Sequence, residues 1–410
     1  SIKEGTDGHT YYGSVFGGGS GYYPYKKADG THEWLRSAGV VYGNTLIDIT
    51  GGHILTCVYG GNETTDVGTY SNNAKGQPLV NVSGGKCTIN MVGGTLGVPR
   101  TDEAAQDRPV TCYLFGAGKG DQRTRFNTWT NVQETEVNVS GTARIFGSVF
   151  GGGEDGHILG NAQVNIGGEV KIDLNGDGDR DDEGETFTAQ NGLKIGTTGT
   201  SYVDGNVFGG GRGFSGLALT AGSTGGNADV NIAGGTMLGS IYGGGRLASV
   251  GIDFTPPTDP LYGQLVDDDN EKTHGHISIT ISGGTIGKET ATGATHPVGG
   301  NVFGGSMGRI TLLDGSLNPI WPKQAVTKKT EITISGGTIF NSVYGGSEYG
   351  IVRDLATVNV SGGTINGNVF GGGYGSDDNT PTYITAGDYA PGADYVFTPM
   401  IWTGCVAGDT

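Results

Sequence analysis

Short apolar–polar–apolar triplets of mostly β-branched residues dominate the hydrophobic pattern of the chain. Residues 358–360 read Val-Asn-Val, and related triplets occupy residues 47–49, 137–139, 164–166, 230–232, 279–281 and 332–334. Such alternation predicts short, half-buried strands. A helical period of 3.6 residues does not occur in any glycine-free window, so the pattern predicts an all-β protein.

A second phrase follows each triplet: an aliphatic residue, an aromatic residue and then glycines. In residues 358–373 the triplet leads to Ser-Gly-Gly-Thr-Ile and then to Asn-Gly-Asn-Val-Phe-Gly-Gly-Gly. Glycine pairs at fixed offsets mark sharp bends. Strand, bend, short strand, bend, short strand and bend together describe one coil of a right-handed parallel β-helix. The aromatic residues of the nine phrases are Phe16, Tyr59, Phe115, Phe150, Phe208, Tyr242, Phe303, Tyr344 and Phe370.

Because the units are alike and run in the same order, they predict one β-solenoid of about nine coils with loop insertions. An antiparallel sandwich would instead need alternating hairpins of unlike strands. We expect a single solenoid domain over residues 1–375, cut from a longer rod, and a C-terminal tail or cap over 376–410. Loops on a rigid scaffold usually carry function, so the insertions are the expected functional segments. They are expected at residues 20–44, 98–111, 172–203, 247–275, 288–298 and 309–328.

Stacked coils place equivalent residues in columns. The polar column at the middle of the first strand is predicted to hold Asp48, Asn81, Asn138, Asn165, Asn231, Thr280, Thr333 and Asn359. We favour an amide ladder that hydrogen-bonds between coils, and the alternative is a polar face for polysaccharide or ice. For the aromatic column we favour a stack inside the rod over an exposed row that contacts sugar rings.

Composition narrows the classes of partner. Glycine accounts for 83 of 410 residues without a Gly-X-Y period, which excludes collagen. The net charge of −17 argues against binding to nucleic acid or to an anionic membrane, and it suits divalent cations. With no apolar run of spanning length and no signal peptide after Ser1, we expect a mature or excised piece of an exported, extracellular or cell-surface protein.

Four cysteines are too few for a disulfide scaffold and lack the paired spacing of a zinc site. They are Cys57, Cys87, Cys112 and Cys405. One disulfide between stacked coils is an open alternative, but we favour small buried residues.

One insertion contains a stretch with specific metal chemistry. Residues 173–185 read Asp-Leu-Asn-Gly-Asp-Gly-Asp-Arg-Asp-Asp-Glu-Gly-Glu. Oxygen ligands at positions 1, 3 and 5 followed by glycine at position 6 suit a tight calcium loop. Over these residues the chain resembles the calcium loops of EF-hand and dockerin-type modules.

That resemblance implies a structural Ca²⁺ that pins the insertion. Asp173, Asn175 and Asp177 would ligate through their side chains, Asp179 through its backbone carbonyl, and Asp181 would take the ninth position. At position 12 the pattern requires a bidentate glutamate, and this chain has Gly184. We therefore predict that Glu183 completes the set, with Glu185 and Asp182 as alternatives.

No serine or cysteine triad, phosphate loop or nucleotide fingerprint is present in the sequence, and we assign no catalytic residue. Over most of residues 13–375 the repeat resembles glycine-rich β-solenoid surface proteins of bacteria, which are adhesin-like. The resemblance implies a non-enzymatic extracellular rod, an adhesin or stalk, whose inserted loops contact a surface glycan or host protein. It also allows end-to-end or lateral self-association.

Two other functions stay open. One is a carbohydrate-active β-helix enzyme, a polysaccharide lyase or hydrolase, for which Glu154, Asp155 and Asp204 near glycine bends would be candidate acids. The other is a structural filament segment whose open ends stack.

Overall fold

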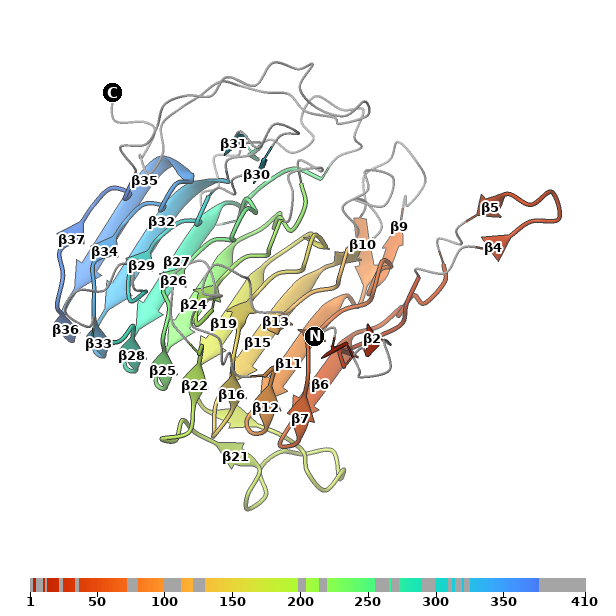
Figure 1. Ribbon diagram of the computed structural model, residues 1–410, viewed down its shortest axis with the longest axis horizontal. Helices are drawn as coiled ribbons and strands as arrows, with labels where there is room; N and C mark the ends of the chain where they lie inside the picture. Colours follow the sequence, from red (N-terminus) through yellow and green to blue (C-terminus); the bar gives the residue numbers. More distant parts are fainter. Residues whose placement is uncertain are drawn as a thin grey trace.

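The computed structural model contains three long parallel sheets that run along one solenoid, each built from strands of successive coils (Figure 1). The structure describes residues 3–4, 10–11, 13–21, 25–33, 37–71, 80–98, 112–120, 130–197, 204–213, 220–254, 265–266, 273–289, 299–308, 312–313, 319–320 and 325–375. The predicted tail over 376–410, with Cys405, lies outside these residues. Within them, no helix is long and apolar enough to cross a membrane.

The first sheet has eight strands, one per coil, and every neighbouring pair is parallel. Its strands are β6 (Thr45–Ile49), β11 (Lys86–Met91), β15 (Glu134–Val139), β19 (Ala162–Ile166), β24 (Ala228–Ile232), β27 (His276–Ile281), β32 (Val326–Ile334) and β35 (Ile351–Val360).

The second and third sheets consist of shorter strands that follow each glycine bend. The second contains β7 (His53–Ile54), β12 (Thr95–Leu96), β16 (Arg144–Ile145), β22 (Lys194–Ile195), β25 (Thr236–Met237), β28 (Thr285–Ile286), β33 (Thr338–Ile339) and β36 (Thr364–Ile365). The third contains β3 (Val15–Phe16), β8 (Val58–Tyr59), β13 (Tyr113–Phe115), β17 (Ser148–Phe150), β23 (Val207–Phe208), β26 (Ile241–Tyr242), β29 (Val302–Phe303), β34 (Val343–Tyr344) and β37 (Val369–Phe370). These nine strands confirm the parallel β-helix of about nine coils.

Short pairs outside the three sheets decorate the solenoid. They are β1 (Lys3–Glu4) with β2 (Thr10–Tyr11), β4 (Tyr25–Lys26) with β5 (His32–Glu33), β9 (Thr69–Ser71) with β10 (Val80–Ser83), β14 (Asn131–Val132) with β18 (His157–Ile158), β20 (Val170–Lys171) with β21 (Thr186–Phe187), and β30 (Leu312–Leu313) with β31 (Pro319–Ile320).

Aliphatic side chains from all three sheets fill the interior. In β15, Val137 and Val139 are fully buried while Glu136 and Asn138 face outward, and the same alternation repeats along the first sheet. The parallel register places Val137 between Ile89 and Val164. Each coil therefore buries its apolar residues only against its neighbours, which is the packing logic of a solenoid.

In every described coil except the last, the glycine after the aromatic residue is required by the close approach of the next coil. A Cβ atom on Gly209 would lie 2.1 Å from the carbonyl oxygen of Gly243, the equivalent residue of the next coil. At the recurrent bend between the first and second strands of a coil, glycine is favoured by the backbone conformation, since Gly235 has a φ of 83°. The repeated glycines are thus a steric requirement of the tight coil.

The nine aromatic residues form one continuous stack that is buried along its middle and partly exposed at its ends. Neighbouring rings lie 4.5–5.1 Å apart between centroids and are nearly parallel. The central members, such as Phe150, Phe208 and Tyr242, are at most 1% exposed. The aromatic column is therefore the structural stack that we favoured.

The described cysteines are buried free thiols. Cys57, Cys87 and Cys112 are at most 7% exposed, and no disulfide joins them. Burial raises the pKa of the Cys87 and Cys112 thiols to about 12. This agrees with the expectation of small buried residues for these three positions.

Candidate functional site: a polar groove and an acidic loop

A continuous ladder of side-chain amides runs across the outer face of the first sheet. The Asn90 amide donates to Asp48 Oδ1 at 2.7 Å, and Asn138 donates to Asn90 Oδ1 at 2.8 Å. The chain of bonds continues from Asn165 to Asn138 at 2.7 Å and from Asn231 to Asn165 at 2.9 Å. These contacts between stacked coils confirm the amide-ladder interpretation for this stretch of the column.

One member of the predicted column is wrong. Asn81 lies in β10, which pairs antiparallel with β9 in a side hairpin, and Val80 and Val82 on either side of it are half or more exposed. The ladder position belongs to Asn90. The strand β11 takes this place because it buries Cys87, Ile89 and Met91 in the interior, which the apolar residues of the 80–82 triplet do not.

A groove of about 630 Å³ lies over the ladder. Its floor is the outer face of β6, β11, β15, β19 and β24, and one wall is the start of the insertion that follows β19. Five described residues of that wall line the groove: Gly168, Glu169, Val170, Lys171 and Arg180. The floor contributes mainly polar side chains: Asn44, Thr45, Lys86, Thr88, Asn90, Glu136, Asn138, Asn165 and Asn231.

Most of the charge in the groove is paired internally. Lys86 Nζ lies 2.6 Å from Glu136 Oε2, and the Asn138 amide donates to Glu136 Oε1 at 3.2 Å. Partial burial alone would raise the pKa of Glu136, but Lys86 and Asn138 outweigh it and hold that pKa below its ordinary value. Lys171 Nζ lies 2.5 Å from Asp181 Oδ1. The groove is therefore polar without a dominant local charge.

The wall is anchored to the solenoid by its apolar base and by one buried carboxylate. Val170, Ile172 and Phe187 pack against Val92, and β20 pairs with β21 to close the insertion. Glu185 is 2% exposed, and its carboxylate accepts the backbone N–H of Leu174 at 2.7 Å and of Asp182 at 3.3 Å. The acidic loop between these strands thus has a defined conformation.

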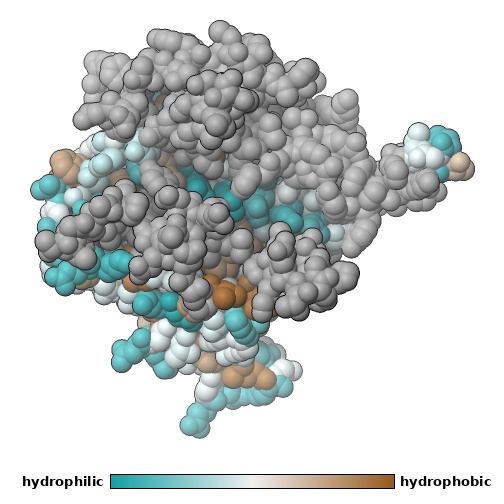
Figure 2. Space-filling model, in the orientation of Figure 1, coloured by the Kyte–Doolittle hydropathy of each residue, from teal (hydrophilic) through white to brown (hydrophobic). Residues whose placement is uncertain are grey.

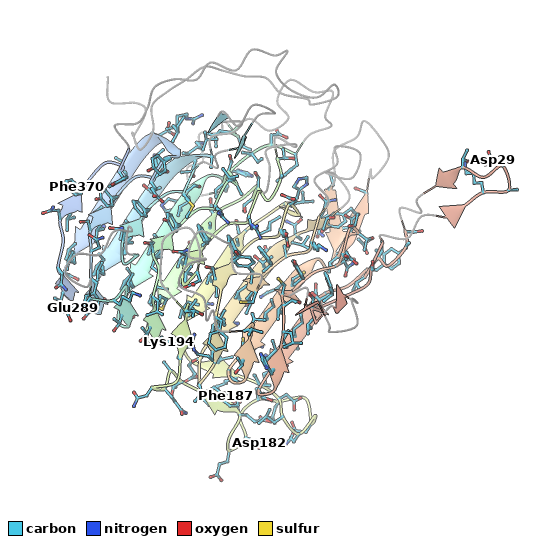
Figure 3. All side chains as sticks on the ribbon, viewed as in Figure 1. Asp29, Asp182, Phe187, Lys194, Glu289 and Phe370 are labelled. Carbon is cyan, nitrogen blue, oxygen red and sulfur yellow. The ribbon has the colours of Figure 1, made fainter. Side chains whose placement is uncertain are left out.

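Three exposed carboxylates gather on that loop. Oxygen atoms of Asp177, Asp179 and Asp182 all lie within 4.8 Å of one another, close enough to bind one metal ion together. The Asn175 amide donates to Asp177 Oδ2 at 3.0 Å and to Asp182 Oδ2 at 2.6 Å. Figure 3, in which Asp182 is labelled, shows the loop as a projection at the lower edge of the molecule, and Figure 2 shows a projection at the same place.

Two of the six predicted ligands, Asp177 and Asp179, belong to this cluster, and Asp182, which the sequence offered only as an alternative, completes it. Asp173 accepts the backbone N–H groups of Gly176 and Gly178 at 2.6 and 3.0 Å. Asn175 bridges the cluster, Asp181 pairs with Lys171, and Glu183 is exposed. The backbone N–H of Asp179 and the Asn175 amide lower the pKa of Asp177.

The acids considered for an enzyme occupy internal positions. Glu154 accepts a hydrogen bond from the Tyr59 hydroxyl, and its Oε1 lies 3.8 Å from Nη1 of Arg212. Asp155 is buried, and buried Asp204 accepts the Thr197 N–H at 2.8 Å. The Glu154 and Asp204 carboxylates are thus held by contacts within the protein, and Asp155 is buried.

Sequence reasoning missed a column of charges beside the aromatic stack. Glu63, Lys119, Glu154 and Arg212 each stand four residues after the aromatic residue of their coil, and their signs alternate. Lys119 Nζ lies 3.2 Å from Glu63 Oε1, and the Arg212 guanidinium lies 4.9 Å from the centre of the Tyr113 ring. A comparison of residues at this fixed offset would have revealed the column.

The sheets define the class of the protein as a parallel β-helix, an all-β solenoid. Comparison with known proteins found no family model that matches the chain, and neither the curated proteins nor the solved structures gave a significant match. The groove and the acidic loop are therefore the features that bear on function.

Proposed function

We propose that this protein is a non-enzymatic extracellular rod, an adhesin or stalk of a bacterial surface protein, which binds a glycan or a protein ligand in the groove. The observation that carries the proposal is the groove of about 630 Å³ built jointly by the amide ladder and the insertion. A concave polar site on a rigid scaffold, with one wall from an inserted loop, is a common arrangement for ligand binding.

Binding of the immobilised protein to an array of neutral and charged glycans and of extracellular matrix proteins tests this proposal. A Thr88→Trp variant serves to block the groove, because Thr88 lines the groove from the outer face of β11 and takes no part in the amide ladder. We expect saturable binding that the variant loses. Absence of saturable binding, or binding that Thr88→Trp leaves unchanged, would refute the role of the groove.

We propose that the acidic loop binds a structural Ca²⁺. The three carboxylates of Asp177, Asp179 and Asp182 supply the hard oxygen ligands that Ca²⁺ prefers. They are concentrated on one loop, and the basic residues near them, Arg180 and Lys171, supply only two positive charges to compensate the acidic ones. The ion would relieve repulsion between the carboxylates and stiffen the insertion, whose first residues form the wall of the groove.

A role as a filament segment is a second candidate. In the last described coil, Val360, Val369 and Phe370 are 42–49% exposed, whereas their counterparts in the middle of the solenoid are buried. Figure 3 places Phe370 at the end of the row of coils. Half-exposed apolar side chains at the edges of two of the three sheets favour contact with another strand edge, including one from a second copy of the chain.

A further inference from the structure

We infer that the groove takes a neutral, hydroxyl-rich polysaccharide that lies along the amide ladder, across the strands and parallel to the solenoid axis. The inference rests on the proposed function and names the ligand class of the same site. It follows from the hydrogen-bonding capacity of the ladder, from its regular spacing and from the pairing of charges around it.

The ladder leaves hydrogen-bonding groups for a ligand. A side-chain amide has two N–H donors and an oxygen with two lone pairs. In the ladder, Asn165 uses one N–H toward Asn138, and its oxygen accepts the Asn231 amide at 2.9 Å and the Gln163 amide at the longer distance of 3.5 Å. Asn231 likewise uses one N–H, and both residues are half-buried on the floor of the groove. Asn165 therefore keeps one N–H to donate to a hydroxyl group, and Asn231 can both donate to and accept from a hydroxyl, which is itself donor and acceptor.

The rungs repeat at one strand spacing. Asn138, Asn165 and Asn231 lie directly opposite one another in adjacent parallel strands, so their separation is about 4.8 Å per coil. A site with translational repetition matches a polymer with a regular repeat of hydroxyl groups. Outside β-sheet ladders such as this one, protein surfaces seldom repeat at this spacing, and we therefore favour a glycan as occupant.

Charge decides between neutral and acidic glycans. Lys86 and Lys171 are already paired with Glu136 and Asp181, which leaves Arg180 and Glu169 as the other charged residues of the lining. The charges of Arg180 and Glu169 are opposite and cancel, and the net charge of the whole chain is −17. A polyanion would approach against that field. A neutral chain meets no such barrier.

The lining also predicts how affinity depends on ligand length. None of the described residues that line the groove is aromatic, so the stacking that anchors single sugar rings is missing there. Binding then relies on many hydrogen bonds of modest strength. Affinity should rise with each added sugar until the chain spans the rungs, after about four units.

Titration calorimetry with neutral oligomers of glucose, mannose, xylose and galactose, two to six units long, tests the inference. We expect at least one series to bind with affinity that rises to about four units and then levels off. Asn165→Ala should weaken binding at least tenfold, and Asn359→Ala, at the equivalent position of the last described coil and outside the groove, should leave it unchanged. Thr88→Trp should abolish binding although it leaves the ladder intact. Loss of binding in this variant would therefore come from the blocked groove and not from a disrupted fold.

The outcomes distinguish the inference from the proposed function. If oligogalacturonate or a protein binds in a Thr88-dependent way while every neutral oligomer fails, the groove functions but its ligand class is wrong. If a neutral oligomer binds equally well to Asn165→Ala and Thr88→Trp, the ladder is not its site, and this inference is overturned. If no glycan or protein binds, the proposed function fails together with the inference.

Discussion

The Tyr242 hydroxyl donates a hydrogen bond to Glu348 Oε2 at 2.6 Å across 106 residues of sequence, and both side chains are almost completely buried. The aromatic stack is therefore fixed at its polar edge by a carboxylate from a coil two turns further on. Tyr242→Phe should lower the free energy of unfolding by about 1–3 kcal/mol, because a buried carboxylate loses a donor.

Tyr344→Phe is the matched control for this prediction. Tyr344 belongs to the same stack but is only partly buried, and we expect its loss of a hydroxyl to cost less than Tyr242→Phe. Urea unfolding followed by circular dichroism measures both. Equal midpoints for Tyr242→Phe and the parent protein would contradict the contribution of the Glu348 contact.

The glycine after each aromatic residue provides a second comparison. A Cβ atom on Gly209 would collide with the Gly243 carbonyl, but one on Gly371, at the same place in the last coil, has no atom within 4 Å. Gly209→Ala should destabilise the protein by roughly 1–3 kcal/mol through the forced separation of coils. Gly371→Ala should change the melting temperature little. Similar effects of the two substitutions would show that close coil approach is not what requires glycine.

Calcium should stabilise the insertion measurably. Addition of CaCl₂ to chelator-treated protein should raise the protection of residues 172–185 in hydrogen exchange, and Asp177→Asn should reduce the apparent affinity at least tenfold. Asp29→Asn changes an exposed acid on a different loop, the one labelled in Figure 3, and is the control. Exchange that is identical with and without the ion would rule out the site.

The pKa of Asp177 gives the sign of the pH dependence. Its folded-state pKa is lowered, so the carboxylate form is favoured above the ordinary pKa of an aspartate and is lost as pH falls through the lowered value. Calcium affinity should accordingly be constant near neutrality and fall below about pH 4. Affinity that increases on acidification would contradict ligation by this carboxylate.

The buried thiols should resist alkylation. With a pKa of about 12, Cys87 and Cys112 carry roughly one thiolate in ten thousand at pH 8. A Cys405→Ser variant treated with iodoacetamide in native buffer should stay unmodified over an hour, and it should gain three labels in 6 M guanidinium. Mass spectrometry counts the labels. Rapid native modification of Cys87 would show that its coil opens readily.

Self-association through the last described coil can be tested at its exposed ring. Phe370→Glu places a charge on a side chain that is 42% exposed and stacks on Tyr344 only from one side, so it should lower the melting temperature modestly without unfolding the protein. Any concentration-dependent oligomer detected by sedimentation velocity should disappear in this variant. An oligomer that persists in Phe370→Glu must use another surface.

The sequence predicted the fold well because each coil repeats the same local requirements. The triplet around Asn138, the bend at Gly235 and the aromatic residue Phe208 each take the predicted place. Asn81 was misplaced because a triplet of the right composition preceded the true strand, and only the burial of Cys87, Ile89 and Met91 separates the two.

The site was less predictable, since it depends on contacts between segments of unlike sequence. Asp182 joins the acidic cluster because Glu185 is buried and its carboxylate accepts the Asp182 N–H, a detail of loop geometry that spacing does not reveal. The groove arises where residues 168–180 meet the ladder. Repeat periodicity describes each coil but not how an insertion folds back over its neighbours.

The amide ladder has a direction. Every asparagine from Asn231 back to Asn90 donates toward the preceding coil, and the last bond ends on Asp48, a carboxylate that only accepts when ionised. No amide in the row can reverse without breaking the bonds of its neighbours. A coil bearing asparagine could therefore be duplicated within the row without changing the direction of the hydrogen bonds. The solenoid could lengthen by whole coils while Asp48 remained the final acceptor.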